Sequence, residues 1–288
     1  MKPRRGGTGR LTTEYEVLSD AIPRPRAVLL DLDGTLYRGD RPVEGADRMV
    51  AAFEAGGTAC WFVTNNSART PEEVAGQLSR MGIPARPDRV ITSATAAAAH
   101  IRKAKPDARL YVIGERGLRE ALRQAGLREA EDGEGAADYV VQGIDRELTY
   151  AKLRAAVRHL LDGAGYVLTN PDRLLPTESG LLPGAGSIAA ALEAASGVRP
   201  LVIGKPSAIM MDEALRRAGV GPGEAWVVGD NPLTDLAAAR AAGCTAVLTL
   251  TGLCTAADWR ERCAGAGVRP DAVCGGPEAV AQLYRKGC

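Results

Sequence analysis

Two aspartates separated by one leucine, Asp31 and Asp33, follow directly on an apolar run at residues 27–30. A continuous apolar run of this kind predicts a buried strand of a parallel sheet. Open α/β sheets bind their ligands at the carboxyl ends of their strands, and two carboxylates this close are costly without a cation or proton between them. Asp-Gly alone is typical of an ordinary turn, but the whole string predicts an acidic ligand site, with Gly34 turning the chain away.

Three further apolar runs end in polar residues. Each cluster alone is also typical of a turn or of a solvated surface. We expect all four runs to be buried strands of one parallel sheet, because that arrangement brings every cluster to a single edge. The three clusters are Thr64 with Asn65 and Asn66 after 59–63, Lys205 after 200–203, and Asp230 with Asp235 after 225–228.

Phosphoryl transfer is the chemistry that suits this set. Asp31 would attack phosphorus and form an aspartyl-phosphate. Asp33 would protonate the leaving oxygen and then deprotonate the hydrolytic water. Hydrolysis of a phosphate monoester requires accelerations of up to roughly 10²¹, so several devices must act together.

The remaining polar residues would hold the phosphoryl group. Thr64 and the backbone amides that follow it, at Asn65 and Asn66, would bind phosphate oxygens. Lys205 would supply positive charge where negative charge develops, and Asp235 would orient Lys205.

A phosphate dianion repels a carboxylate nucleophile, so the reaction requires a cation between them. Magnesium prefers hard oxygen ligands. Asp31, Asp230 and a backbone carbonyl at Asp33 would supply them. We therefore expect Mg²⁺ as the cofactor.

The order of helices and strands predicts an α/β protein with a Rossmann-like, doubly wound parallel sheet. Residues 104–184 carry a strand and helix alternation of their own, which predicts an inserted α/β domain. The core would then consist of 21–103 and 185–288, including a helix at 187–195 and the strand at 200–203. The basic, glycine-rich residues 1–20 predict a flexible tail.

The composition excludes several partners. The 288 residues carry a formal net charge of +1, and 45% of them are hydrophobic. We expect no nucleic acid and no membrane as partner, because the charge provides no attractive field and no apolar run reaches the roughly 20 residues of a membrane span. The six cysteines form no metal-binding pattern, so free thiols in a reducing cytoplasm are expected.

Together these motifs resemble the haloacid dehalogenase-like hydrolases, and in particular their NagD-like branch. The resemblance implies Asp31 as nucleophile, Asp33 as acid and base, and Asp230 as metal ligand. It also implies a cap domain of the second type, a small phosphate ester as substrate and, in some members, a homodimer formed through the cap. The motifs that carry it are Asp31-Leu-Asp-Gly-Thr-Leu36, Thr64-Asn-Asn-Ser67, Thr169-Asn-Pro-Asp172, Gly204-Lys-Pro206 and Gly229-Asp-Asn-x-x-Thr-Asp235.

In that branch the cap selects the substrate, and the loop after Asn170 would lie over the active site. Its expected specificity residues are Asp172, Arg173, Leu174 and Leu175. The pyridoxal phosphatases of the branch carry a histidine where Leu175 aligns. This departure argues against pyridoxal phosphate as the substrate.

Other functions remain open at this stage. A phosphotransferase or phosphomutase would use the same aspartyl-phosphate but pass it to an organic acceptor. A non-catalytic binding protein on this fold would be expected to lose one of Asp31, Asp33, Lys205 or Asp230. A dinucleotide-dependent dehydrogenase is disfavoured, because no Gly-x-Gly-x-x-Gly follows the first apolar run.

Overall fold

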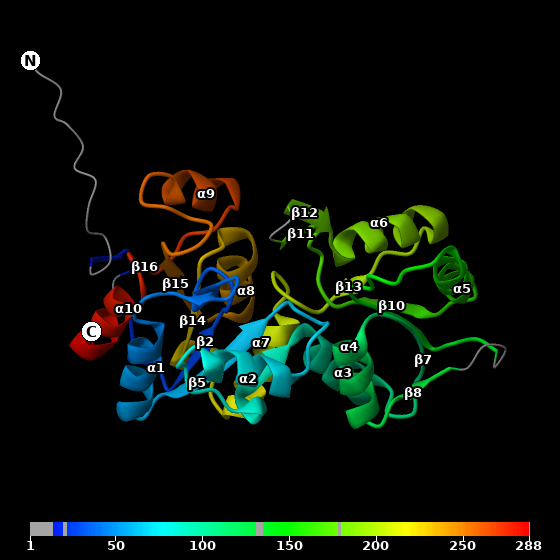
Figure 1. The fold of residues 1–288 in the computed structure, drawn as a ribbon, viewed down its shortest axis with the longest axis horizontal. Coiled ribbons are helices and arrows are strands. Elements are labelled where there is room, and N and C mark those ends of the chain that lie inside the picture. Colours follow the sequence, from blue (N-terminus) through cyan, green and yellow to red (C-terminus); the bar gives the residue numbers. More distant parts are fainter. Residues whose placement is uncertain (1–13, 20–21, 131–134, 178–179, 288) are drawn as a thin grey trace, which may run out of the picture.

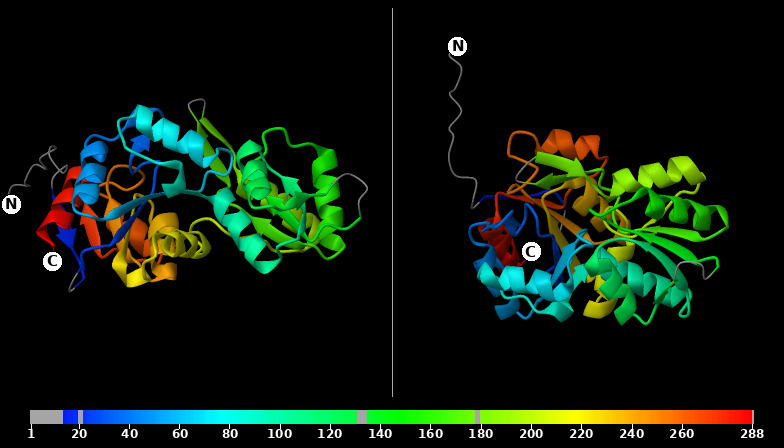
Figure 2. Two further views of the ribbon diagram at one scale, coloured as in Figure 1. Left: turned by 90° about the horizontal axis from the view of Figure 1, so that it is seen from below. Right: turned by 45° about the vertical axis from the view of Figure 1, so that its right-hand side comes forward.

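The computed structural model describes residues 14–19, 22–130, 135–177 and 180–287, and its two larger sheets lie in two lobes (Figures 1 and 2). Two small hairpins, β3 (Tyr37–Arg38) with β4 (Arg41–Pro42) and β11 (Leu174–Thr177) with β12 (Gly180–Pro183), form sheets of their own. We call the lobe around the larger sheet the core. Its sheet is parallel except for the antiparallel edge strand β1. In spatial order its strands are β1 (Tyr15–Val17), β16 (Ala272–Cys274), β15 (Thr245–Thr249), β14 (Ala225–Gly229), β2 (Ala27–Leu30), β5 (Ala59–Thr64) and β6 (Val90–Thr92).

Helices cover both faces of the core sheet, as the doubly wound prediction requires. Each helix buries an apolar stripe; α1, for example, buries Met49, Val50 and Phe53. One face carries α1 (Ala46–Ala55), α2 (Pro71–Arg80) and α10 (Pro277–Lys286), and the other carries α3 (Ser93–Ala104), α7 (Ile209–Ala218), α8 (Ala237–Ala242) and α9 (Trp259–Gly265).

The start of α2 follows from its first residues. The Thr70 hydroxyl accepts a hydrogen bond from the Glu73 amide, and the Glu73 carboxylate accepts one of 2.9 Å from the Thr70 amide. Pro71 occupies the first turn, where no amide donor is needed. This reciprocal cap satisfies two amide donors at the start of α2, those of Thr70 and Glu73.

The second lobe, which we call the cap, has a fully parallel sheet. Among the described residues, its other elements are three helices and a two-stranded hairpin beside the core (Figure 1). In spatial order the strands are β13 (Leu201–Val202), β10 (Gly165–Leu168), β9 (Tyr139–Gln142), β7 (Arg109–Ile113) and β8 (Arg128–Glu129); the helices are α4 (Arg116–Gln124), α5 (Tyr150–Leu161) and α6 (Ala185–Ser196), and the hairpin strands are β11 (Leu174–Thr177) and β12 (Gly180–Pro183).

Two elements that we expected in the core lie in the cap. Helix α6 packs its Ile188 and Leu192 into the apolar cluster of α5 and the cap sheet, and β13 pairs with β10. An apolar pattern identifies a helix or a strand but not the sheet that it joins, so the expected return to the core at residue 185 came too early. By sheet membership the chain re-enters the core after Val202.

The expected flexible tail also ends earlier than residue 20. Tyr15–Val17 form β1, which pairs with β16. A three-residue strand of mixed polarity has no clear periodicity, and its partner lies more than 250 residues away. Residues 1–13 and 20 of the expected tail lie outside the described residues.

The joint between the lobes is apolar. Ala97 and Ile101 of α3 belong to the same buried cluster as Leu118 and Leu122 of α4. The cap is therefore packed on the core through a continuous apolar contact, which resists relative displacement more than a hydrated linker would.

Two further expectations concern the chain as a whole. The described cysteines are free, as expected, and all of them are buried, where a free cysteine behaves as a small apolar residue. In the part of the chain that the structure describes, no helix combines the length and the apolar character needed to cross a bilayer.

Candidate active site

Three neighbouring strands end at one edge of the core sheet and carry most of the candidate residues. Asp31 follows β2, Thr64 ends β5 and Asp230 follows β14, and these strands are adjacent in the order β14-β2-β5. Asp235 lies in a single π-helical turn (Pro232–Leu236) that follows β14. The parallel arrangement thus brings these residues together as their spacing predicts.

Lys205 reaches the same place by a different route from the one we expected. It follows β13, an edge strand of the cap sheet with Leu201 44% exposed, rather than a buried strand of the core. The segment between β13 and α7 re-enters the core, and Lys205 lies in it. The Lys205 Nζ donates hydrogen bonds to Asp31 Oδ1 and, over 2.6 Å, to Asp235 Oδ1.

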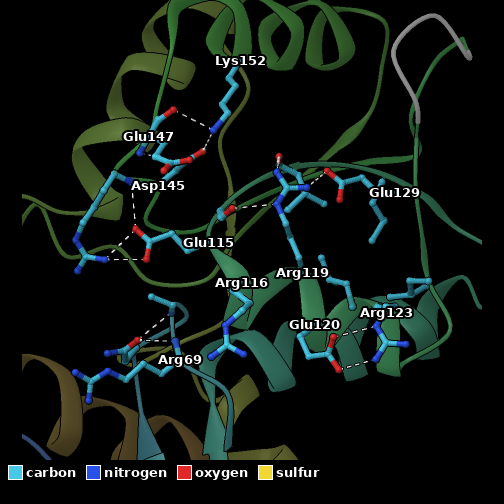
Figure 3. A pocket seen from close by; sticks show the side chains of 18 of the residues that line it. Arg69, Glu115, Arg116, Arg119, Glu120, Arg123, Glu129, Asp145, Glu147 and Lys152 are labelled. Carbon is cyan, nitrogen blue, oxygen red and sulfur yellow. Dashed lines mark hydrogen bonds and ion pairs between the residues drawn. The ribbon is translucent and has the colours of Figure 1, made fainter. Parts of the chain in front are cut away.

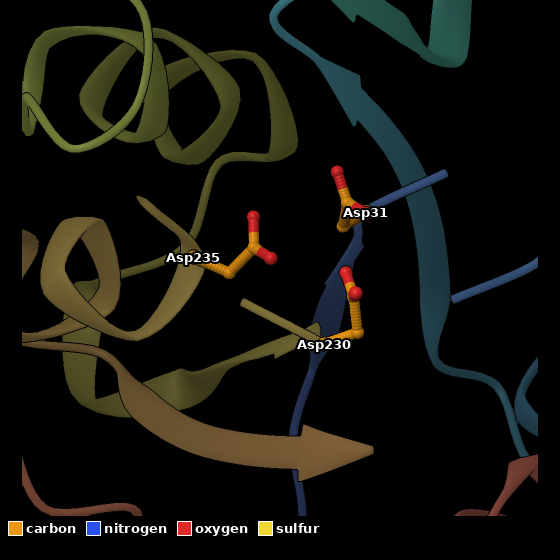
Figure 4. A group of neighbouring side chains, drawn as sticks. All are labelled: Asp31, Asp230 and Asp235. Carbon is orange, nitrogen blue, oxygen red and sulfur yellow. The ribbon is translucent and has the colours of Figure 1, made fainter. Parts of the chain in front are cut away.

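The acidic residues surround one small space. Oxygens of Asp31, Asp230 and Asp235 all lie within 4.8 Å of one another, and Figure 4 shows the three side chains arranged about this space. Asp31 is 9% exposed, Asp230 6% and Asp235 1%. Lys205 is itself 3% exposed and is bonded to two of these three buried carboxylates, those of Asp31 and Asp235.

This concentration of charge shifts the pKa values. Burial, followed by repulsion from Asp235, raises the pKa of Asp31 well above its usual range, although Lys205 opposes the shift. The same two causes raise the pKa of Asp230 to about 6. Burial disfavours the charged form of Lys205, but the carboxylates of Asp235 and Asp31 outweigh it and raise its pKa. A divalent cation beside Asp31 and Asp230 would relieve the carboxylate repulsion, and hard oxygens are the ligands that magnesium prefers.

The orientation of Asp230 is fixed by its neighbours. Its Oδ2 accepts a hydrogen bond of 2.6 Å from the amide of Leu253. A Cβ atom at Gly34 or at Gly252 would collide with this carboxylate. Gly34 also has a φ of 84°, which favours glycine. The glycine of the Asp-Gly turn therefore gives Asp230 its space.

Asp33 is exposed, unlike Asp31, Asp230 and Asp235. The protein around it still desolvates the carboxyl group and raises its pKa, while a hydrogen bond from the Tyr37 hydroxyl opposes that rise. A raised pKa favours the protonated form that a general acid requires.

The loop after β5 is held by its own side chains. The amide of Asn66 donates to Thr64 Oγ1 over 3.1 Å, and Asn66 Oδ1 accepts from the amides of Ala68 and Arg69. The Asn65 side chain binds both backbone groups of Lys205, accepting from its amide over 2.8 Å and donating to its carbonyl over 3.0 Å. The Asn65 side chain therefore fixes the backbone at Lys205, a contact that its position in an apparent turn sequence does not reveal.

The cap loop approaches the site through Asp172. The Asn65 amide group lies 3.4 Å from Asp172 Oδ2, and burial raises the pKa of Asp172. Arg173 and Leu174 are exposed, and Leu175 is half-buried in β11. Among the expected specificity residues, Asp172 thus lies beside the residues of the site.

A cleft of about 1160 Å³ lies between the loop after β5 and the cap. Figure 3 shows its charged lining, which includes Arg69, Arg116 and Glu115. Asp31, Asp230 and Asp235 are not part of this lining, but Asn66, Ala68 and Arg69 connect it to the loop beside the site. The cleft extends the site towards the cap.

Comparisons with known proteins agree with this geometry. Residues 28–128 match a family model described as haloacid dehalogenase-like hydrolase, and residues 202–276 match a related HAD-hydrolase-like model. The chain is 44% identical to the 5'-nucleotidase YutF of Bacillus subtilis over 79% of this chain and 88% of that protein. It is 40% identical to an acid sugar phosphatase of Staphylococcus aureus over 82% of this chain and 91% of that protein. The p-nitrophenyl phosphatase of Archaeoglobus fulgidus has the same fold, with a TM-score of 0.86, 34% identity and coverage of 91% of this chain and 100% of that chain.

Proposed function

Because the chain belongs to the haloacid dehalogenase-like hydrolases and is a phosphoric monoester hydrolase, we propose that it is a magnesium-dependent phosphatase that acts through an aspartyl-phosphate. The observation that carries this proposal is the buried group of Asp31, Asp230, Asp235 and Lys205 at the carboxyl edge of the core sheet. Burying several charges together costs stability, and such clusters are typical of active sites. A non-catalytic protein on this fold would have no reason to keep them.

Asp31 is the nucleophile in this proposal. Its carboxylate attacks phosphorus while Asp33 donates a proton to the leaving oxygen. Asp33 then removes a proton from the water that hydrolyses the aspartyl-phosphate. Its exposed position suits both proton transfers, since the leaving group and the hydrolytic water must both have access from solvent.

Thr64, the backbone at Asn65 and Asn66, and Lys205 hold the phosphoryl oxygens. The ammonium group of Lys205 places a fixed positive charge beside the nucleophile. Asp235 fixes that ammonium group over 2.6 Å, so Lys205 needs no reorganisation as negative charge develops.

Asp31 and Asp230, with the backbone carbonyl at Asp33, would hold Mg²⁺. When bound, the ion supplies positive charge that permits a phosphate dianion to approach a carboxylate. Both carboxylate oxygens of Asp235 accept hydrogen bonds, Oδ1 from Lys205 Nζ over 2.6 Å and Oδ2 from the amide of Asn231 over 3.1 Å, so we assign the metal to Asp31 and Asp230 in the same acidic group.

The substrate that we propose is a small phosphorylated metabolite. The relatives are named for a nucleotide, sugar phosphates and an aryl phosphate, so these classes come first in a screen. A test follows directly: the purified protein with MgCl₂ is incubated with sugar phosphates, glycerol phosphate, phosphoglycolate, nucleoside monophosphates, pyridoxal phosphate and p-nitrophenyl phosphate, and inorganic phosphate is measured. Release without any added acceptor supports hydrolysis; release only with an organic acceptor would identify a phosphotransferase.

We also propose that the protein forms a homodimer through the cap and acts in the cytoplasm. The cap hairpin exposes Leu174, Leu181 and Leu182, which are 56%, 64% and 42% exposed, and such apolar patches are typical of interfaces. Sedimentation equilibrium tests this proposal, because a monomer at micromolar concentration would contradict it.

A further inference from the structure

The loop after β5, residues 64–69, is held from the cap side at three points. The Gly117 amide donates a hydrogen bond of 3.0 Å to the carbonyl of Ala68. The Asn170 side chain donates one of 2.9 Å to the carbonyl of Asn65. Gly143 packs so closely on Ser67 that an added Cβ would lie 2.6 Å from its hydroxyl oxygen.

The three cap residues that make these contacts each follow a different strand of the cap sheet. Gly117 follows β7, Gly143 follows β9 and Asn170 follows β10. The carboxyl ends of the cap strands thus meet the loop that ends β5. A parallel sheet commonly binds ligands at that edge, but here the edge of the cap holds a segment of the core.

Gly117 is the tightest of these contacts. A Cβ at this position would lie 2.5 Å from the backbone carbon of Ala68 and 2.7 Å from its oxygen. Both are backbone atoms, so no side-chain rotation could relieve the overlap. A glycine in the first turn of α4 costs helix stability relative to alanine, and the approach to Ala68 explains why this position has no side chain.

Charged and apolar contacts surround this point. Arg116 forms an ion pair with Glu73, the residue that completes the cap of α2 (Figure 3 shows Arg116 beside the cleft). Leu118 belongs to the apolar cluster that includes Ile101 of α3. The first turn of α4 is therefore fixed against the core on both sides of Gly117.

A displacement of Ala68 would reach Thr64 through a short series of hydrogen bonds. The amide of Ala68 donates to Asn66 Oδ1 over 2.9 Å, and the amide of Asn66 donates to Thr64 Oγ1 over 3.1 Å. Each link joins neighbours in one compact turn, so a shift at one end moves the other.

We propose that Gly117 is a positioning residue through which the cap sets the geometry of the phosphate-holding loop. The inference rests on the proposed function, since it gives that loop its role. It has a specific consequence: a disturbance at Gly117 alters the handling of the phosphoryl group and so affects every substrate by the same factor. A cap residue that contacts only the leaving group would affect substrates unequally.

The test compares Gly117→Ala with Gly76→Ala, a matched control in α2 whose added methyl would meet only the end of the Arg80 side chain at 3.6 Å. The measurements are kcat and KM for p-nitrophenyl phosphate and for glycerol phosphate, and the inhibition constant of inorganic phosphate. We expect Gly117→Ala to lower kcat about 10- to 100-fold for both substrates and to weaken inhibition by phosphate. Gly76→Ala should match the wild type.

An unchanged phosphate inhibition constant, or a loss confined to one substrate, would overturn the proposal. If Gly117→Ala does not fold, Asn170→Ala tests the same hold of the cap on the loop, because it removes the 2.9 Å hydrogen bond to the Asn65 carbonyl without removing a charge: weaker phosphate inhibition with an unchanged melting temperature supports the proposal, and unchanged inhibition rejects it. A wild-type protein that releases phosphate from none of the screened substrates would refute the proposed function, whereas an active wild type with an equally active Gly117→Ala would refute only this inference.

Discussion

Lys205 Nζ lies 2.6 Å from Asp235 Oδ1, and the two residues are 3% and 1% exposed. Lys205 follows a strand of the cap sheet, whereas Asp235 follows a strand of the core sheet. Their contact therefore joins the two sheets beside the nucleophile.

Removing the charge of Asp235 should disturb Lys205 without deleting a group that touches the substrate. We expect Asp235→Asn to lower kcat for p-nitrophenyl phosphate about 10- to 100-fold with little change in KM, because the ammonium group loses its fixed orientation. Asp107→Asn, which changes an exposed aspartate, is the control. Equal activity of the two variants would show that Lys205 is positioned without Asp235.

Binding of magnesium should be measurable without turnover. An ion held by Asp31 and Asp230 stabilises the folded protein by mass action, so millimolar MgCl₂ should raise the melting temperature of the wild type. The rise should vanish in Asp230→Asn, and EDTA should abolish phosphatase activity until magnesium is restored. Activity that survives exhaustive chelation would remove the metal from the mechanism.

The pH dependence should respond to Tyr37. Its hydroxyl donates a hydrogen bond to the ionised form of Asp33 and so holds the pKa of that carboxyl group down, although burial raises it overall. Tyr37→Phe removes this bond, so the pKa of Asp33 should rise and its protonated form should persist to higher pH. The alkaline limb of the kcat/KM profile should therefore move to higher pH; a limb that stays in place or moves to lower pH would contradict the assigned role of Asp33.

Much of the core could be predicted because its signals are local. The apolar runs before Asp31, Thr64 and Asp230 became buried strands, and the residues Thr70 to Glu73 became a reciprocal helix cap. Each of these features lies within about ten residues of sequence. The polar residues at the strand ends then met because parallel strands share one direction.

The errors concern contacts between distant segments. The pattern of α6 and β13 did not show that they join the cap sheet, and β1 pairs with a strand near the other end of the chain. The contact between Gly117 and Ala68 was equally hidden, because a glycine near the start of a helix has no local signature of a neighbouring backbone. Side-chain roles such as that of Asn65 depend on which loop lies opposite.

Two buried threonines offer a test of the packing. Thr169 Oγ1 is buried without a hydrogen-bond partner among the described residues, whereas Thr58 Oγ1 donates to the Pro25 carbonyl over 2.9 Å and lies 2.8 Å from the Tyr284 hydroxyl. Thr169→Val should leave the free energy of unfolding unchanged or raise it. Thr58→Val should lower it by about 1–3 kcal/mol, because partners of the hydroxyl stay buried and unpaired. Urea denaturation measures both, and a larger loss in Thr169→Val would contradict the packing described.

The most direct measurement is the rate of phosphate release from p-nitrophenyl phosphate by Asp31→Asn in the presence of MgCl₂. Asparagine keeps the size of the side chain but is a far weaker nucleophile than a carboxylate. With a melting temperature and circular dichroism spectrum that show a folded protein, kcat should fall by a factor on the order of 10⁴ to 10⁶. Turnover close to that of the wild type would contradict the aspartyl-phosphate mechanism.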